Sequence, residues 1–140
     1  MTQIDQTDIQ ILNHLNRNCR ITKNHLAQLV HLTPPAVAAR IAQLEDSGVI
    51  RKYTIEVDPE KLGYTHQVFI QIQLAHFNHQ DYHAFIHRKR NFIRHHYKIS
   101  GQMNEMLQAA FHSSAELNAF LVELEAYANY QVLEIIDELI

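Results

Sequence analysis

The sequence of 140 residues predicts an α+β fold in two domains, and two observations carry this prediction. Before residue 50, apolar residues recur at helical spacing in three short segments, whereas after it period-two strand patterns alternate with helical ones. Charge divides at the same place. Residues 1–52 hold six Lys or Arg against four Asp or Glu, whereas residues 53–140 hold six against eleven. We therefore expect a weakly basic helical domain followed by an acidic α+β domain.

The composition excludes several classes of protein. A hydrophobic fraction of 46 % is typical of globular chains, and no apolar run is long enough to span a membrane. The polar start lacks the regions of a signal peptide, and the single Cys19 permits no intrachain disulfide. Phosphate-binding glycine loops and nucleophile or zinc-protease motifs are absent from the sequence. We expect a cytoplasmic protein that is not an enzyme, without a cofactor or a bound metal.

The first two helices are predicted from their caps and apolar stripes. Asp5 can cap a first helix, and Asp8 adds negative charge near its positive end. Thr22 can cap a second, short helix over residues 23–30, which a tight turn at His31 and Leu32 ends. The expected buried residues are Ile9, Leu12 and Leu15 in the first helix and Leu26, Leu29 and Val30 in the second.

A third helix is predicted from Thr33 to Ser47. The Thr33 hydroxyl can cap it, Pro34 suits the first helical position, and Gly48 ends it. Its buried face is expected to hold Val37, Ile41 and Leu44, and its outward face Pro35, Ala36, Ala39, Arg40 and Gln43. Two helices joined by so short a turn form a helix-turn-helix, whose second helix fits the major groove of double-stranded DNA.

The side chains of the third helix suit modest base recognition. Arg40 can approach guanine, Gln43 can pair with adenine, and the methyl groups of Ala36 and Ala39 suit thymine. Residues 49–57 are predicted to form an extended wing strand, which brings Arg51 and Lys52 to the DNA backbone. The expected DNA-binding residues are Arg20, Lys23, Thr33, Pro35, Ala36, Ala39, Arg40, Gln43, Arg51 and Lys52.

Strand and helix patterns alternate through the rest of the chain. The expected order is a strand over 67–74, a helix over 81–90, strands over 93–99 and 107–111, a helix begun by a Ser113–Glu116 capping box, and a strand over 132–139. This βαββαβ order is that of the ferredoxin-like fold. The predicted domains are a winged helix-turn-helix over 1–50, a linker over 51–65 and a dimerisation and effector domain over 66–140.

Histidine is unusually frequent, with eleven residues. His79, His83 and His87 lie at i, i+4 and i+8 on the predicted helix, close in sequence to His76. A solvated helix face explains this spacing most simply, and a metal- or pH-responsive module is the alternative function. The basic run of residues 88–90 with Arg94 is similarly explained by its place at a helix C-terminus, and contact with DNA is the alternative.

Three motifs carry a resemblance to a known family: Asp5-x-x-Asp8-x-x-Ile11-Leu12, Leu32-Thr33-Pro34, and Arg40-Ile41-x-x-Leu44-Glu45-x-x-Gly48-Val49-Ile50. With the order of the two domains, they make the chain similar to the Lrp/AsnC, or feast/famine, transcriptional regulators over its whole length. The resemblance implies a homodimer paired through the sheets of the second domain, which often assembles further into octamers. It also implies small effectors, commonly amino acids, held between dimers.

The expected effector loop departs from the family pattern. Family members typically have Gly-x-x-Asp here, whereas this chain has Gly101, Gln102, Met103 and Asn104. If the acid pairs with the ammonium group of an amino acid, Asn104 offers a carbonyl without charge, and a charge-assisted hydrogen bond is roughly twice as strong as a neutral one. The hypothesis that follows is a different effector or none.

Overall fold

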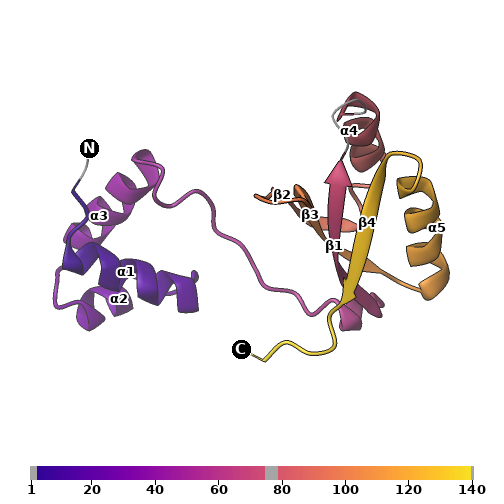
Figure 1. Cartoon of the computed structure of the whole chain (residues 1–140). Coiled ribbons are helices and arrows are strands. Elements are labelled where there is room, and N and C mark those ends of the chain that lie inside the picture. Colours follow the sequence, from indigo (N-terminus) through magenta and orange to yellow (C-terminus); the bar gives the residue numbers. More distant parts are fainter. Residues whose placement is uncertain (1–2, 75–78, 140) are drawn as a thin grey trace. The chain divides into compact units, whose positions relative to one another are not determined.

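The computed structural model describes residues 3–74 and 79–139, and these form two compact units, Met1–Glu56 and Val57–Ile140 (Figure 1). Each unit has its own apolar core. Among the described residues, no helix combines the length and the apolar character needed to cross a membrane.

Three helices build the N-terminal unit: α1 (Gln6–Arg17), α2 (Lys23–Leu29) and α3 (Pro34–Asp46). The predicted caps are confirmed, because the side chains of Asp5, Thr22 and Thr33 each accept a hydrogen bond from a backbone N–H three residues later. The core consists of Ile11, Leu15, Leu26, Ala27, Val30, Val37, Ile41 and Leu44. The inward face predicted for α3 is therefore confirmed.

Two predictions of buried residues in these helices are wrong. Ile9 and Leu29 are each 42 % exposed, while Ile11 and Ala27 are buried in the core. The spacing of apolar residues alone admits more than one face, and contact with α3 selects the line of Asp8, Ile11 and Leu15 in α1.

Backbone geometry sets the ends of α2 and α3. His31 takes a left-handed conformation with φ 56°, and the Leu32 N–H then donates to the Ala27 carbonyl at 2.9 Å. Gly48 ends α3 with φ 74°, a value that favours glycine. The tight turn of a helix-turn-helix is thus present between α2 and α3, as predicted.

The predicted wing strand is not formed. No residue from 49 to 57 belongs to a strand, although the segment between 51 and 57 carries apolar residues at every second position. Tyr53, Ile55 and Val57 are 48 %, 76 % and 42 % exposed. A strand requires a hydrogen-bonded neighbour, and the described residues supply none for this segment.

The C-terminal unit has the predicted βαββαβ order. A short 3-10 turn, η1 (Glu60–Leu62), precedes β1 (His66–Leu74), α4 (His79–Arg88), β2 (Ile93–Lys98), β3 (Glu105–Phe111), α5 (Ser114–Leu124) and β4 (Ala128–Glu134). The strands form an antiparallel sheet in the order β2-β3-β1-β4 (Figure 1). The fold class predicted from the sequence is confirmed.

Both helices pack on one face of this sheet. Tyr82 and Phe85 of α4 and Phe120 and Leu124 of α5 join the inward residues of β1 and β3 in one core. On the other face of the sheet, β1 and β4 place Phe69 opposite Leu133, which is 42 % exposed. No helix in the described part of the unit packs against that second face.

Three local predictions in this unit are corrected. The last strand begins at Ala128 instead of residue 132, since Ala128, Tyr130 and Val132 pair with inward residues of β1. The strand predicted over 93–99 ends at Lys98, and an irregularity between Ile93 and His95 interrupts its pairing with β3. The Glu116 carboxylate accepts from the His112 N–H at 2.8 Å instead of completing a box with Ser113.

Candidate nucleic-acid interface

The exposed face of α3 consists of small and polar side chains. Pro35, Ala39 and Gln43 lie at i, i+4 and i+8 and are all exposed, whereas Val37, Ile41 and Leu44 are buried on the other side. Ala36 is half-buried, and the Thr33 hydroxyl accepts from its N–H at 3.4 Å. The helix can therefore approach a partner closely along this row.

Arg40 does not point outward as predicted. Its Nη1 donates to Asp5 Oδ2 and to Asp8 Oδ1, each at 2.8 Å, and its side chain is 31 % exposed. Arg40 lies on the flank of α3 that faces the start of α1. Asp5, predicted to cap α1, and Asp8, predicted to add negative charge near its positive end, occupy that flank.

The same two acids form a capping box at the start of α1. Asp8 N–H donates to Asp5 at 2.8 Å, and Asp5 N–H donates to Asp8 at 3.0 Å. The hydrogen bond from the Asp8 N–H, followed by that from Arg40, lowers the pKa of Asp5. Arg40 of α3 thus fixes the start of α1.

Four cations among the expected DNA-binding residues are exposed: Arg20, Lys23, Arg51 and Lys52. None forms an ion pair within the described ranges 3–74 and 79–139. Positive charge of this kind is suited to the DNA backbone.

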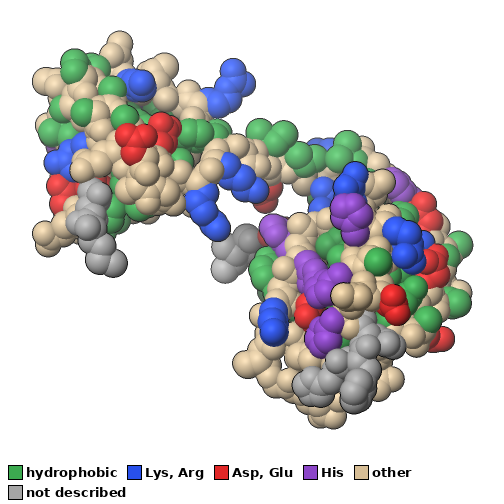
Figure 2. All heavy atoms as spheres, turned by 90° about the horizontal axis from the view of Figure 1, so that it is seen from above, with side chains coloured by type: hydrophobic (Ala, Val, Ile, Leu, Met, Phe, Trp, Pro, Cys, Tyr) green, Lys and Arg blue, Asp and Glu red, His purple; other side chains and the backbone are tan. Residues whose placement is uncertain are grey.

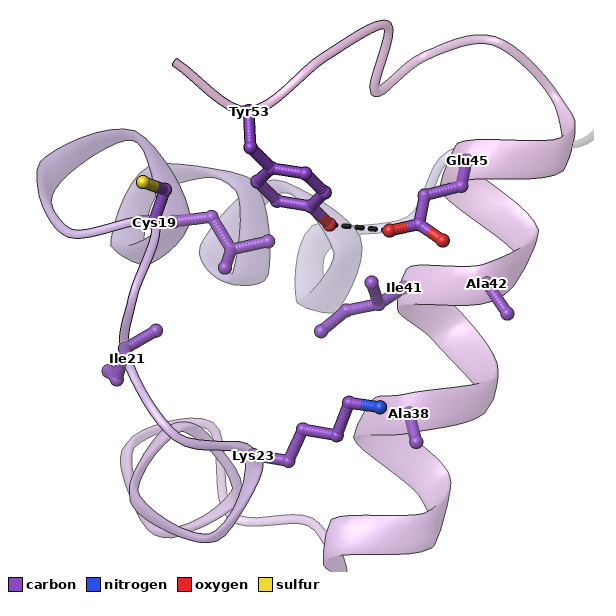
Figure 3. A pocket seen from close by; sticks show the side chains of 9 residues that line it. Cys19, Ile21, Lys23, Ala38, Ile41, Ala42, Glu45 and Tyr53 are labelled. Atoms are coloured by element: carbon purple, nitrogen blue, oxygen red, sulfur yellow. Dashed lines mark hydrogen bonds between the residues drawn. The ribbon is translucent and has the colours of Figure 1, made fainter. Parts of the chain in front are cut away.

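A pocket of about 190 Å³ lies between the helices and the start of the linker (Figure 3). The Tyr53 hydroxyl donates to Glu45 Oε1 at 2.6 Å, and Cys19 is half-buried with its thiol 3.6 Å from the Thr54 carbonyl oxygen. Burial, followed by the hydrogen bond with Glu45, raises the pKa of Tyr53 to about 12. Lys23 extends along this pocket beside Ala38 (Figure 3). Tyr53 thereby holds the chain that follows Arg51 and Lys52 against α3.

The predicted effector residues Gly101, Gln102, Met103 and Asn104 lie between β2 and β3. Gly101 has φ 113°, a conformation that favours glycine. The side chain of Asn104 is engaged with the backbone of Leu74: its Oδ1 accepts from the N–H at 2.9 Å, and its Nδ2 donates to the carbonyl at 3.3 Å. An aspartate could not make the second of these hydrogen bonds while ionised.

The histidine-rich helix contains a stacked pair. The rings of His79 and His83 lie 6.4 Å apart, and that of His83 lies 6.3 Å from His96 of β2. Within residues 3–74 and 79–139, no three His, Cys, Asp or Glu side chains are grouped so that they could hold a metal ion. His76 falls outside the described residues.

Comparison with known proteins identifies the family. Residues 4–51 match a family described as winged helix-turn-helix DNA-binding. The chain is 40 % identical over 129 residues to the HTH-type transcriptional regulator LrpA of Bacillus subtilis, covering 92 % of this chain and 95 % of LrpA. The chain belongs to the Lrp/AsnC family of transcriptional regulators. The resemblance found in the three sequence motifs is therefore confirmed.

Solved structures of Lrp/AsnC regulators share the fold. The structure of B. subtilis LrpC gives a TM-score of 0.91 at 28 % identity, covering 99 % of this chain and 98 % of that one. A transcriptional regulator from Neisseria meningitidis, solved as a complex with L-Met, gives 0.88 at 28 % identity, covering 98 % and 92 %. This Lrp/AsnC chain is a DNA-binding transcriptional regulator, and its relatives are regulators, not enzymes.

Proposed function

We propose that this regulator reads DNA with the exposed row of α3 formed by Pro35, Ala39 and Gln43, with Ala36 and Thr33 beside it. The exposure of this row on the second helix of the helix-turn-helix carries the proposal. Gln43 can form a bidentate contact with adenine, and the alanine methyl groups suit thymine methyls. Few hydrogen bonds are available on this face, so DNA deformability supplies part of the discrimination.

Phosphate contacts come from the four exposed cations of the N-terminal unit, Arg20, Lys23, Arg51 and Lys52. Such contacts supply affinity that depends on salt but not on sequence. Arg40 takes a different role from base readout, because its guanidinium is held by Asp5 and Asp8. It acts as a positioning residue that fixes α3 relative to α1.

The reading face is tested by Gln43→Ala. A binding site is first selected from a pool of random duplexes, and affinities are then measured by fluorescence anisotropy. Loss of one bidentate contact costs about 1–3 kcal/mol, so affinity for the selected site should fall roughly 5- to 150-fold. Affinity for unselected DNA should stay unchanged.

Gln10→Ala, at an exposed position of α1, is the matched control and should leave both affinities unchanged. Equal losses on selected and unselected DNA in the Gln43 variant would contradict the assignment of Gln43 to base readout.

We further propose that the protein acts as a homodimer in the cytoplasm, where its DNA lies, and assembles into higher oligomers such as an octamer. A helix-turn-helix dimer reads two half-sites about one turn of DNA apart. The second half-site raises the affinity of the dimer above that of one weakly binding copy. The open sheet face and the exposed alternation of Tyr53, Ile55 and Val57 support pairing of two copies.

The loop from Gly101 to Asn104 is proposed as the effector loop. The L-Met complex of the Neisseria regulator supports an amino-acid-like effector for this kind of protein. In this chain the Asn104 amide is already paired with Leu74 and carries no charge, which favours a ligand that is not anchored by its ammonium group here. Calorimetry against the twenty amino acids and their N-acetyl forms tests this, and tight binding of an amino acid that N-acetylation abolishes would contradict it.

A further inference from the structure

Positive charge in the acidic C-terminal unit is concentrated in one short segment. Of the six Lys or Arg residues after position 57, five fall between residues 88 and 98, and the sixth is Lys61. No Asp or Glu occurs from residue 82 to residue 104. The five clustered residues are Arg88, Lys89, Arg90, Arg94 and Lys98.

The fold brings this segment to the rim of the sheet. It includes the end of α4 and all of β2, which is an edge strand with a single neighbour, β3. Lys and Arg side chains gather beside histidines on the face of this unit seen in Figure 2. The cations are therefore presented together at one edge of an otherwise acidic unit.

Three of the five cations make a contact within the unit. Lys89 forms an ion pair with Glu123 of α5, the Arg88 guanidinium lies 5.9 Å from the Phe85 ring centroid, and Arg94 lies over the Tyr64 ring. Arg90, Arg94 and Lys98 are exposed and form no ion pair in the part of the chain that the structure describes. We call these three residues the basic edge.

Local structural reasons account for only part of the basic edge. The dipole of α4 favours cations near its C-terminus, which explains Arg88 and the adjoining Arg90 but not Arg94 and Lys98 of β2. Charges on an edge strand, lysine above all, prevent unwanted pairing, but that purpose does not require the absence of every acid from residue 82 to residue 104. The uniform sign of the charge points instead to an anionic partner.

We propose that the basic edge is a second contact surface for the phosphate backbone of duplex DNA, in addition to the helix-turn-helix. This inference rests on the proposed DNA binding through α3. Four residues of strand span roughly 13 Å, so Arg94 and Lys98 can reach several charges of a duplex that carries one per about 1.7 Å. Arg94 lies 5.0 Å from the Tyr64 ring centroid, and that contact steadies its guanidinium.

Salt titration of the full-length chain tests the proposal. The probe is a 60-base-pair duplex of mixed sequence, and log Kobs is measured against log[KCl] for the wild type and for Arg90→Gln/Arg94→Gln/Lys98→Gln. Each lost phosphate contact reduces the magnitude of the slope by about 0.9. The slope of the triple variant should therefore be smaller in magnitude by about 2.7 per protomer. Arg90→Gln/Lys98→Gln keeps the contact with Tyr64 and should be shallower by about 1.8.

Lys61→Gln is the matched control, since it removes the one cation of this unit outside the segment, which lies 3.8 Å from Asp58. It should keep the wild-type slope. An unchanged slope in the triple variant would overturn the proposal. If the size of the oligomer changed as well, the basic edge would bind another copy of the chain instead of DNA. A wild type without DNA affinity would overturn the proposed function as well.

Discussion

At the scale of single residues, Arg40 shows how neighbours decide the role of a side chain. On a helical wheel it belongs to the outward side of α3, next to residues that do face solvent. Two carboxylates more than thirty residues earlier in the chain hold both of its hydrogen bonds from Nη1 instead. Its position along α3 does not reveal this pairing, because α1 and α3 meet only in the folded unit.

The pairing with Arg40 predicts that the contribution of Asp5 to the free energy of unfolding depends on pH. Asparagine is as good a helix cap as aspartate, so Asp5→Asn keeps the cap and removes only the ionic pairing with Arg40. Because the folded state lowers the pKa of Asp5, the stabilisation is present at neutral pH and is lost as pH falls through the lowered value. Urea denaturation should show Asp5→Asn less stable than wild type at pH 7.

The difference between the two proteins should shrink below the ordinary carboxylate value of 3.8. Glu56→Gln removes an exposed carboxylate with no ion pair in the described residues and serves as control. A gap between Asp5→Asn and wild type that stayed constant down to strongly acidic pH would refute the ionic contribution.

Asn104 is the second residue whose role depends on its partner. In Asn104→Asp, the ionised carboxylate cannot donate to the Leu74 carbonyl and leaves it without that hydrogen bond. We expect a loss of about 1–3 kcal/mol in the free energy of unfolding, measured by denaturation at pH 7. Asn118→Asp, at an exposed position of α5, should change little. A fully stable Asn104→Asp protein would show that these bonds do not maintain the loop.

At the scale of elements, local signals were sufficient for the helices of the N-terminal unit. Asp5, Thr22 and Thr33 cap them through atoms three residues away, an interaction that the sequence displays directly. Long-range pairing decided the strands. The bounds of β4 and the irregularity in β2 depend on their neighbours in the sheet, so the period-two pattern alone misplaced them.

The turn of the helix-turn-helix carries a conformational cost that can be removed. A residue other than glycine in the left-handed region costs roughly 1–2 kcal/mol, and His31 adopts φ 56°. We expect His31→Gly to raise the free energy of unfolding by about 1 kcal/mol, because the gain exceeds the larger entropy loss of glycine. Thermal denaturation followed by circular dichroism measures it.

His25→Gly, within α2, provides a control of opposite sign and should destabilise by about 1 kcal/mol. If His31→Gly were also destabilising, a side-chain contribution of His31 would outweigh its backbone cost.

At the scale of the whole molecule, the open face of the sheet predicts how copies associate. Leu133→Arg places a charge on that face, opposite Phe69. Burying it in a dimer interface would be costly, so the dimer dissociation constant should rise at least about tenfold. Light scattering coupled to size exclusion measures the mass, and affinity for DNA should fall with it.

Val122→Arg introduces the same charge at a 58 % exposed position of α5 and should leave the mass unchanged. A wild type that is monomeric with and without amino acids would contradict the expected assembly, whatever the behaviour of the Leu133 variant.

The sequence by itself determined the fold class, the order of elements and the caps of α1, α2 and α3, because these follow from spacing and short-range hydrogen bonding. The family followed from the resemblance of three sequence motifs. Only the tertiary structure decided that Arg40 binds Asp5 and Asp8, that Asn104 binds Leu74, and that the residue 49–57 segment forms no strand. It also placed Arg94 and Lys98 on an edge strand. Each of these depends on groups distant in the chain, and period and composition do not specify which of them meet.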